Sequence, residues 1–214
     1  MKKILQLYTV SMSIRFLEGL PEPLRKAGYE LVVVCADGPE ARVGEKNGGF
    51  KFYPVEMARG ISLSQNIRAW LQVRKILKIE KPDIVHGNTP VGGLIVLSAA
   101  CSLGIKNRVF TLHGLKYPGE IGLKRVIVRM MEKVSLSLSK RVYAVSEGLR
   151  QYAYTEKLIK EEKITILNHG SVKGIDIEMA NQIRSRGRNY YENQCGLSHN
   201  TFRFGYFGRI NEDK

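Results

Sequence analysis

The stretch IVHGNTPVGGLIVLSAACSLGIKNRVFTLH, residues 84–113, decides the fold. It reads as a short apolar strand at Ile84–His86, a helix from Pro90 to about Leu103 with Thr89 at its N-cap, and a second strand at Arg108–Leu112. A helix between two strands that are apolar on both faces is typical of a parallel β-sheet covered by helices. The sequence therefore predicts an α/β domain.

The same alternation of strand and helix continues on both sides of this unit. We expect five further strands, at Ile4–Tyr8, Leu31–Cys35, Phe50–Val55, Val142–Val145 and Ile164–Leu167. We expect further helices at Phe16–Ala27 (interrupted by Pro21 and Pro23), at Leu63–Glu80, at Ile121–Ser139 and after Ser146. Together these elements predict a Rossmann-like, doubly wound parallel sheet over residues 1–175. Ligands of such sheets bind in the crevice beyond the carboxyl ends of the strands.

The charge is unevenly distributed. The 214 residues carry a net charge of +14, and residues 61–160 alone contain 17 basic and 6 acidic side chains. Such a block predicts a surface that faces lipid head groups, phosphates or nucleic acid, and an ordinary solvated surface is the alternative. No apolar run reaches the about 20 residues needed to cross a bilayer, so we expect any membrane contact to be peripheral. The three widely spaced cysteines show no metal-binding pattern, which predicts no metal site and a reduced, cytoplasmic location.

The helix expected at 121–139 has two faces. By its periodicity we place one stripe in the core, namely Ile127, Met131, Val134 and Leu138. We place a basic line on the opposite side, namely Arg125, Arg129 and Lys133. Basic residues among exposed apolar ones indicate contact with an anionic bilayer. We do not expect nucleic acid as a partner, because no aromatic residues interleave with these charges.

The loop after the first strand contains Ser11, Ser13 and Arg15 instead of Gly-x-Gly-x-x-Gly. The missing glycines argue against an enzyme that uses a dinucleotide cofactor. The two hydroxyls and the guanidinium can donate to a phosphate, or they can belong to a simple capped turn.

His113, followed by Gly114, is the sharpest candidate site residue, because it stands at the carboxyl end of a central strand and a neutral imidazole can accept or donate a hydrogen bond. A histidine satisfied within the core is the alternative. His86 occupies a similar place, followed by Asn88 and Thr89, and for it both interpretations stay open. The loops after the last two strands add further candidates for the cleft, namely Ser146, Glu147, Asn168 and Gly170.

The chain ends in a segment that reads as a new strand, Phe202–Phe207, and a turn at Gly208-Arg209. Arg209 and Lys214 have a spacing that can clamp a diphosphate. Because a single strand leaves its backbone unpaired, we expect the chain to be the front part of a longer protein and inactive by itself. We expect a linker or helical segment at 176–200 and the first strand of a second domain at 201–214.

Taken in order, several short motifs resemble those of the retaining family-four glycosyltransferases, which have the two-domain GT-B architecture. Within that family the chain is similar to bacterial enzymes that extend polyprenyl-diphosphate-linked sugars for surface polysaccharides. The motifs are residues 11–19, 26–34, 81–86, 111–115, 141–147, 168–170, 174–176 and 207–214.

The resemblance implies an acceptor-binding first domain and a donor-binding second domain. It implies that His113 contacts the donor sugar and that Arg209 and Lys214 neutralise the donor diphosphate, so that neither a metal nor a cofactor is needed. The substrates would be a nucleotide sugar, UDP-linked, and a polyprenyl-diphosphate-linked saccharide at the inner face of the cytoplasmic membrane. The chain departs from the family in its first loop, in His86-Gly-Asn88 where His-x-His is frequent, and at Lys173 where asparagine is common.

Two alternatives remain open from the sequence. One is a GT-B nucleotide-sugar 2-epimerase, and the other is a peripheral membrane or nucleic-acid binding module without enzymatic activity.

Overall fold

A computed structural model of the chain describes residues 1–57, 62–172, 174, 176–185, 194 and 196. Its contacts divide the chain into two units, Met1–Lys173 and Gly174–Lys214. The described part of the second unit contains one helix, α7 (Ile177–Ser185). The strand expected at 201–214, with Gly208, Arg209 and Lys214, lies outside the described residues, so the division into domains stays a prediction.

The first unit is built on a seven-stranded sheet in the order β3-β2-β1-β4-β5-β6-β7, and every neighbouring pair is parallel. The strands are β1 (Lys2–Leu7), β2 (Tyr29–Cys35), β3 (Lys51–Pro54), β4 (Ile84–Gly87), β5 (Arg108–Leu112), β6 (Arg141–Ala144) and β7 (Ile164–Ile166). The strand order reverses between β1 and β4, which is where ligands of such sheets bind. The predicted Rossmann-like α/β fold is confirmed.

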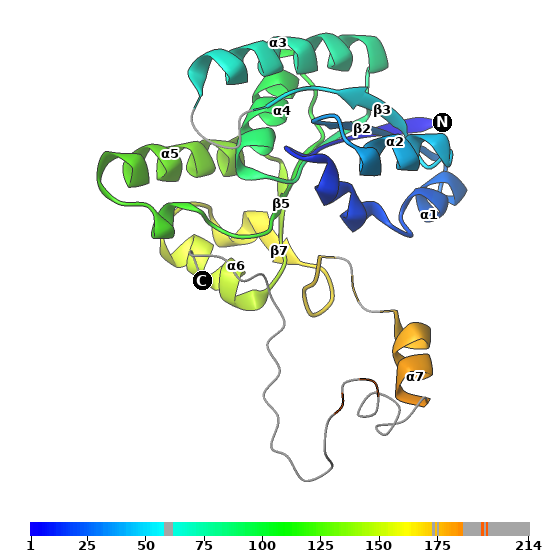
Figure 1. Cartoon of the computed structure of the whole chain (residues 1–214). Helices are drawn as coiled ribbons and strands as arrows, with labels where there is room; N and C mark the ends of the chain where they lie inside the picture. Colours follow the sequence, from blue (N-terminus) through cyan, green and yellow to red (C-terminus); the bar gives the residue numbers. More distant parts are fainter. Residues whose placement is uncertain (58–61, 173, 175, 186–193, 195, 197–214) are drawn as a thin grey trace. The chain divides into compact units, whose positions relative to one another are not determined.

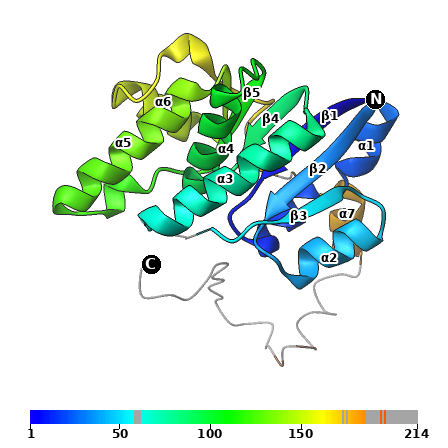
Figure 2. The same ribbon diagram turned by 90° about the horizontal axis from the view of Figure 1, so that it is seen from above.

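Helices cover the two faces of the sheet (Figure 1, Figure 2). On one face, α4 (Pro90–Ser102) packs between α3 (Leu63–Glu80) and α5 (Gly122–Leu138). On the other face, η1 (Ser11–Leu17), α1 (Pro21–Lys26) and α2 (Pro39–Lys46) pack against β1, β2 and β3. The remaining helical segments are η2 (Tyr117–Gly119), α6 (Glu147–Thr155) and η3 (Glu161–Lys163).

Alternate side chains along the strands pack into two separate hydrophobic cores, one on each face of the sheet. Leu5 and Leu7 of β1 pack into the core under α3, α4 and α5. Leu31, Val33 and Cys35 of β2 pack into the core under η1, α1 and α2. This burial on both sides explains why the strands are apolar without alternation.

One local expectation is wrong, and one helix was not predicted. The helix expected at Phe16–Ala27 is two elements, η1 and α1, because Gly19 adopts a positive φ of 77° and Pro21 starts a new helix. The second helix of the chain, α2, was not predicted. It is eight residues long, buries only Ala41 and contains Gly44, so its apolar pattern is weak.

Candidate functional site

Candidate side chains gather at the carboxyl edge of the sheet, near the point where the strand order reverses. Two adjoining hollows there, about 330 and 480 Å³ in volume, share six lining residues. These residues are Tyr8, Phe16, Asn88, Thr111, His113 and Val172. We call the space that they line the His113 hollow.

His113 lines this hollow and has a hydrogen-bonding atom without a partner among the described residues. Its ring stacks on Phe16 of η1, with the ring centres 5.6 Å apart and an angle of 18° between the planes. Burial lowers the pKa of His113, so the imidazole is neutral at physiological pH. Its Nε2 atom is buried and has no hydrogen-bond partner among the described residues. A neutral imidazole in this state can bind one polar atom of a ligand.

His86, in contrast, already has a partner. Its Nε2 lies 2.8 Å from Oγ1 of Thr111 on the neighbouring strand. Burial, helped by the nearby His113, lowers the pKa of His86 to about 4. His86 lines the smaller of the two hollows as a neutral side chain. Its role in the site stays a prediction.

Asn88 and Thr89 join the ends of β1 and β4. The amide of buried Asn88 donates to Oε1 of Gln6 at 3.4 Å, and the hydroxyl of Tyr8 donates to the same oxygen at 2.8 Å. Thr89 stands at the N-cap of α4, as expected, but its side chain does not cap the helix. Its Oγ1 lies 2.6 Å from Oγ1 of Thr9 instead. These contacts fix the loops at the reversal point.

The three candidates of the first loop are separated in the structure. Ser13 lines the larger hollow beside His113. The hydroxyl of Ser11 donates to Glu40 at 2.8 Å, and Arg15 pairs with the same carboxylate at 3.9 Å. The bond from Ser11 is the main reason why the pKa of Glu40 is lowered. Ser11, Ser13 and Arg15 therefore share no pocket among those of the described residues, and the structure does not support the expectation that they act on one phosphate.

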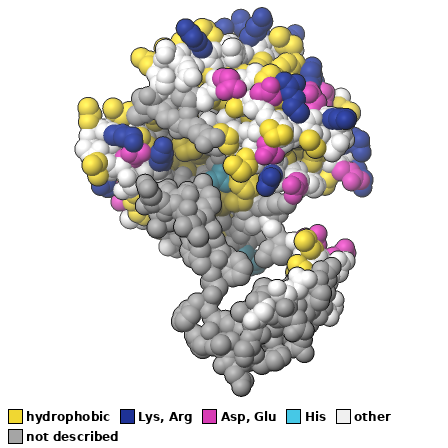
Figure 3. All heavy atoms as spheres, viewed as in Figure 1, with side chains coloured by type: hydrophobic (Ala, Val, Ile, Leu, Met, Phe, Trp, Pro, Cys, Tyr) yellow, Lys and Arg dark blue, Asp and Glu magenta, His cyan; other side chains and the backbone are white. Residues whose placement is uncertain are grey.

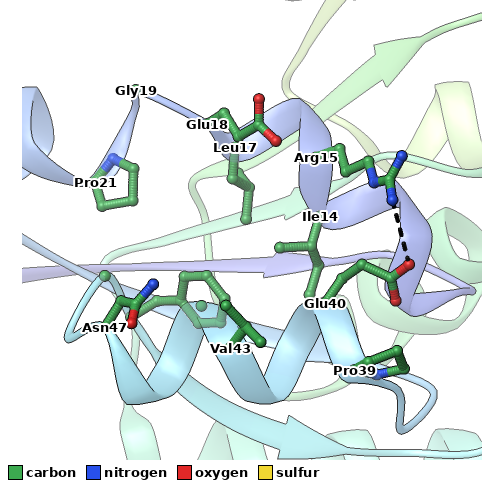
Figure 4. A pocket seen from close by; sticks show the side chains of 13 residues that line it. Ile14, Arg15, Leu17, Glu18, Gly19, Pro21, Pro39, Glu40, Val43 and Asn47 are labelled. Carbon is green, nitrogen blue, oxygen red and sulfur yellow. Dashed lines mark ion pairs between the residues drawn. The ribbon is translucent and has the colours of Figure 1, made fainter.

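The Arg15–Glu40 pair closes one end of a separate groove (Figure 4). This groove, about 570 Å³ in volume, runs between η1 and α2 and is lined mainly by apolar side chains such as Ile14, Leu17 and Val43.

Ser146 and Glu147 start α6. Ser146 accepts a hydrogen bond from the amide of Leu149 at 3.3 Å and so caps the helix expected after it. Glu147 forms an ion pair with Arg150 at 2.7 Å, and the hydrogen bonds of that arginine lower the pKa of Glu147. Neither residue lines the His113 hollow.

The loop after β7 approaches the loop after β6. Asn168 and Gly170 both adopt positive φ, 51° and 83°. A Cβ atom on Gly170 would lie 2.6 Å from the carbonyl oxygen of Val145, so the close approach requires glycine. The next two residues, Ser171 and Val172, reach the smaller hollow.

The expected orientation of α5 is wrong in part: of the four residues assigned to the core, Leu138 packs against it and Met131 is half-buried. Ile127 and Val134, assigned to the core, are exposed, whereas Val128 and Leu136 are buried. Buried Glu132 lies on the same stripe as these two residues, four positions from each. The predicted stripe and the stripe that is buried both contain apolar residues, so the periodicity of the sequence does not show which of the two faces the core.

Two of the three basic residues assigned to the outer face of α5 pack on a side chain of the preceding loop. The guanidinium carbons of Arg125 and Arg129 lie 5.8 and 5.7 Å from the ring centre of buried Tyr117. Arg129 also donates to the carbonyl oxygen of Glu156 at 2.7 Å. Lys133 is exposed.

Sequence reasoning missed Phe16, Tyr117 and Glu132. Of these, only Glu132 could have been noticed in the sequence, because it is an acidic residue on the same helical stripe as the apolar Val128 and Leu136. Within the part of the chain that is described, no cluster of histidine, cysteine and acidic side chains is suited to a metal ion. No described helix has the length and apolar character needed to span a bilayer.

Comparison with known proteins assigns the family. Residues 15–171 match the family described as Glycosyltransferase Family 4. The chain belongs to this family. Over 213 residues the family 4 chain is 33% identical to the capsular polysaccharide biosynthesis glycosyltransferase CapM of Staphylococcus aureus, covering 100% of this chain and 54% of CapM.

A second relative is the UDP-Gal:alpha-D-GlcNAc-diphosphoundecaprenol alpha-1,3-galactosyltransferase of Escherichia coli, 24% identical over 88% of this chain and 48% of the relative. The family 4 chain thus spans about half the length of these relatives.

Solved structures share the fold. A glycosyltransferase from Rickettsia africae matches with a TM-score of 0.68 at 16% identity, over 93% of this chain and 50% of that one. A UDP-N-acetylglucosamine 2-epimerase from Rickettsia bellii matches with a TM-score of 0.61 at 16% identity, over 92% of this chain and 52% of the epimerase chain. At these identities the likeness concerns the fold alone.

Proposed function

We propose that the chain is the acceptor-binding half of a retaining glycosyltransferase of cell-surface polysaccharide synthesis. The enzyme would move a hexosyl or N-acetylhexosaminyl group from a UDP-linked donor to a polyprenyl-diphosphate-linked saccharide. Membership of family 4 supports the reaction type, and the two relatives support the classes of donor and acceptor.

His113 carries the proposal. It lines a hollow at the carboxyl edge of the sheet, where a transferred sugar would lie, and its buried Nε2 has no hydrogen-bond partner among the described residues. A hydrogen bond from this nitrogen to a sugar hydroxyl would orient the reacting carbon. The leaving group is a nucleoside diphosphate, so its growing negative charge needs stabilisation, which we assign to Arg209 and Lys214. Ser13, Asn88, Thr89 and Gly114 would contact the acceptor in the same site.

The test is substitution of His113 in the full-length protein. We expect H113A to lower kcat/KM for transfer to a lipid-linked acceptor by about 100-fold, as for loss of one preorganised donor, while the protein stays folded. H113Q, which keeps a polar atom, should lose less. Transfer by H113A at the wild-type rate would remove His113 from the mechanism.

The shared fold leaves a 2-epimerase as the second candidate. Incubation of the full-length protein with a UDP-N-acetylhexosamine and no acceptor separates the two. Epimerised sugar nucleotide would favour the epimerase, and transfer only in the presence of acceptor favours our proposal.

We further propose that one face of α5 lies on an anionic membrane, which places the protein at the inner face of the cytoplasmic membrane. An exposed apolar stripe runs along this helix, namely Leu123, Val126, Met130 and Val134. Exposed Lys124 and Lys133 flank it. In Figure 3 the surface over α5 shows hydrophobic side chains beside basic ones. A basic residue near anionic lipid contributes about 1 kcal/mol, so the contact would be weak and reversible.

Two valines with nearly equal exposure provide the test. Val126 on α5 is 56% exposed, and Val43 on α2, across the sheet, is 57% exposed. We expect V126E to reduce flotation of the full-length protein with anionic vesicles, V43E to leave it unchanged, and salt to weaken wild-type binding. Equal flotation of both variants would refute this contact. Binding of an oligonucleotide without binding of vesicles would point to nucleic acid instead.

A further inference from the structure

The loop that carries His113 is anchored to a buried acid of α5. Glu132 is buried, and its Oε1 accepts a hydrogen bond from the backbone amide of Lys116 at 2.6 Å. The amide of Tyr117 also acts on this carboxylate and lowers its pKa. Burial raises the pKa of Glu132, and the two amides oppose that effect by stabilising the charged form.

The side chain of Tyr117 adds a second hold on the same loop. It is buried, its hydroxyl donates to Glu156 at 2.9 Å, and the guanidinium groups of Arg125 and Arg129 lie on its ring. The loop is therefore fixed to α5 through both its backbone and its side chain.

Three residues connect this anchor to the sheet. β5 ends at Leu112, which is paired in register with β6. Only His113, Gly114 and Leu115 lie between that strand end and the amide of Lys116. A segment held at both ends over three residues has little freedom, so moving the Lys116 end moves the backbone of His113.

We propose that Glu132 is a positioning residue, which through the amides of Lys116 and Tyr117 holds His113 in its place at the hollow. This inference rests on the proposed role of His113. A short helical turn such as η2 leaves its first amides without partners, and the carboxylate supplies an acceptor for them. The presence of Glu132 at this position is poorly explained by stability alone. Its Oε2 is buried without a hydrogen-bond partner among the described residues, and burying such an atom costs free energy.

Two substitutions in the full-length protein separate the acceptor from the charge. E132Q keeps an oxygen that accepts from the amides, and E132M keeps the shape but removes the acceptor. We expect E132Q to retain kcat within about threefold of wild type. We expect E132M to lose about 100-fold in kcat, as for a displaced catalytic group, with little change in KM for the nucleotide sugar. If E132Q were as impaired as E132M, or E132M as active as wild type, the proposal would fail.

A double substitution tests whether the effect passes through His113. If Glu132 acts by positioning the imidazole, E132M should cost little further activity in the H113A background. Full additivity would contradict the inference. Hydrogen exchange of the Lys116 and Tyr117 amides, faster in E132M than in E132Q, reports the anchor without any assay of transfer. If the full-length protein shows no transfer but these amides respond as expected, the reaction assignment has failed and the anchor has not.

Discussion

Replacing Glu80 by glutamine should destabilise the chain by about 2 kcal/mol at pH 7, and the deficit should shrink in acid. Glu80 ends α3 at the amino edge of the sheet, and its side chain is 1% exposed. It accepts hydrogen bonds from Lys3 at 2.7 Å, from Lys51 at 2.6 Å and from the hydroxyl of Tyr53 at 2.5 Å. One carboxylate thus joins β1, β3 and α3.

The magnitude follows from the pKa. Burial by itself would raise the pKa of Glu80, but the bonds from Lys3, Lys51 and Tyr53 outweigh it and lower the pKa from 4.5 to about 2. At 1.36 kcal/mol per unit this difference corresponds to about 3 kcal/mol. The side chains of Lys3 and Lys51 are 31% and 50% exposed, so solvent screens the pairs and we expect about 2 kcal/mol.

Because the folded pKa is depressed, this contribution is complete above pH 4.5 and is lost as the pH falls toward 2. The measurement is urea unfolding of wild type and E80Q between pH 7 and pH 3, where less than about half of the difference should remain. The matched control is E30Q, because Glu30 faces the same Lys3 from 3.9 Å and is 42% exposed. It should change stability by less than about 0.5 kcal/mol. A difference between wild type and E80Q that is constant with pH would refute the reasoning.

Two further pairs of substitutions test single contacts in and near the site. G170A should cost about 1–3 kcal/mol, since its Cβ would collide with the carbonyl oxygen of Val145, whereas G48A, also at positive φ but in open space, should cost less. Equal melting temperatures for the two variants would contradict the close approach. T111V should cost about 1–3 kcal/mol in urea unfolding by removing the partner of buried His86, and T111S should restore it. A T111V protein as stable as wild type would mean that this bond is unimportant.

Much of the fold was predictable from local sequence. Strands buried on both faces leave continuous apolar runs, and the helix at Leu63–Glu80 has the bounds expected because Lys81 and Pro82 end it. α2 escaped prediction because a short helix with a glycine inside has a weak pattern. Its formation depends on packing against η1 and β3, which local sequence does not show.

The place of a candidate residue in the fold was predictable where position along a strand determines it. His113 was identified because it follows a central strand, and the structure places it in a hollow. Its stacking partner Phe16 comes from a distant element, so no local pattern indicates it. The separation of Ser13 from Arg15 likewise depends on the turn of η1 and on Glu40 of α2, which only the folded chain brings together.

The two faces of α5 join the two parts of the proposed function. Its buried face carries Glu132, which binds the loop of His113, and its outer face exposes Val126 and Met130. A helix is stiff over this length, so a membrane contact on its outer face would fix the distance between its buried face and the bilayer surface. If α5 rests on the bilayer, the imidazole stands at a set distance from the lipid that bears the acceptor. Thus a charge at Val126 should impair transfer to a lipid-linked acceptor more than transfer to a detergent-dispersed, short-chain analogue, whereas E132M should impair both equally. Equal losses with both acceptors in V126E would separate membrane contact from catalysis.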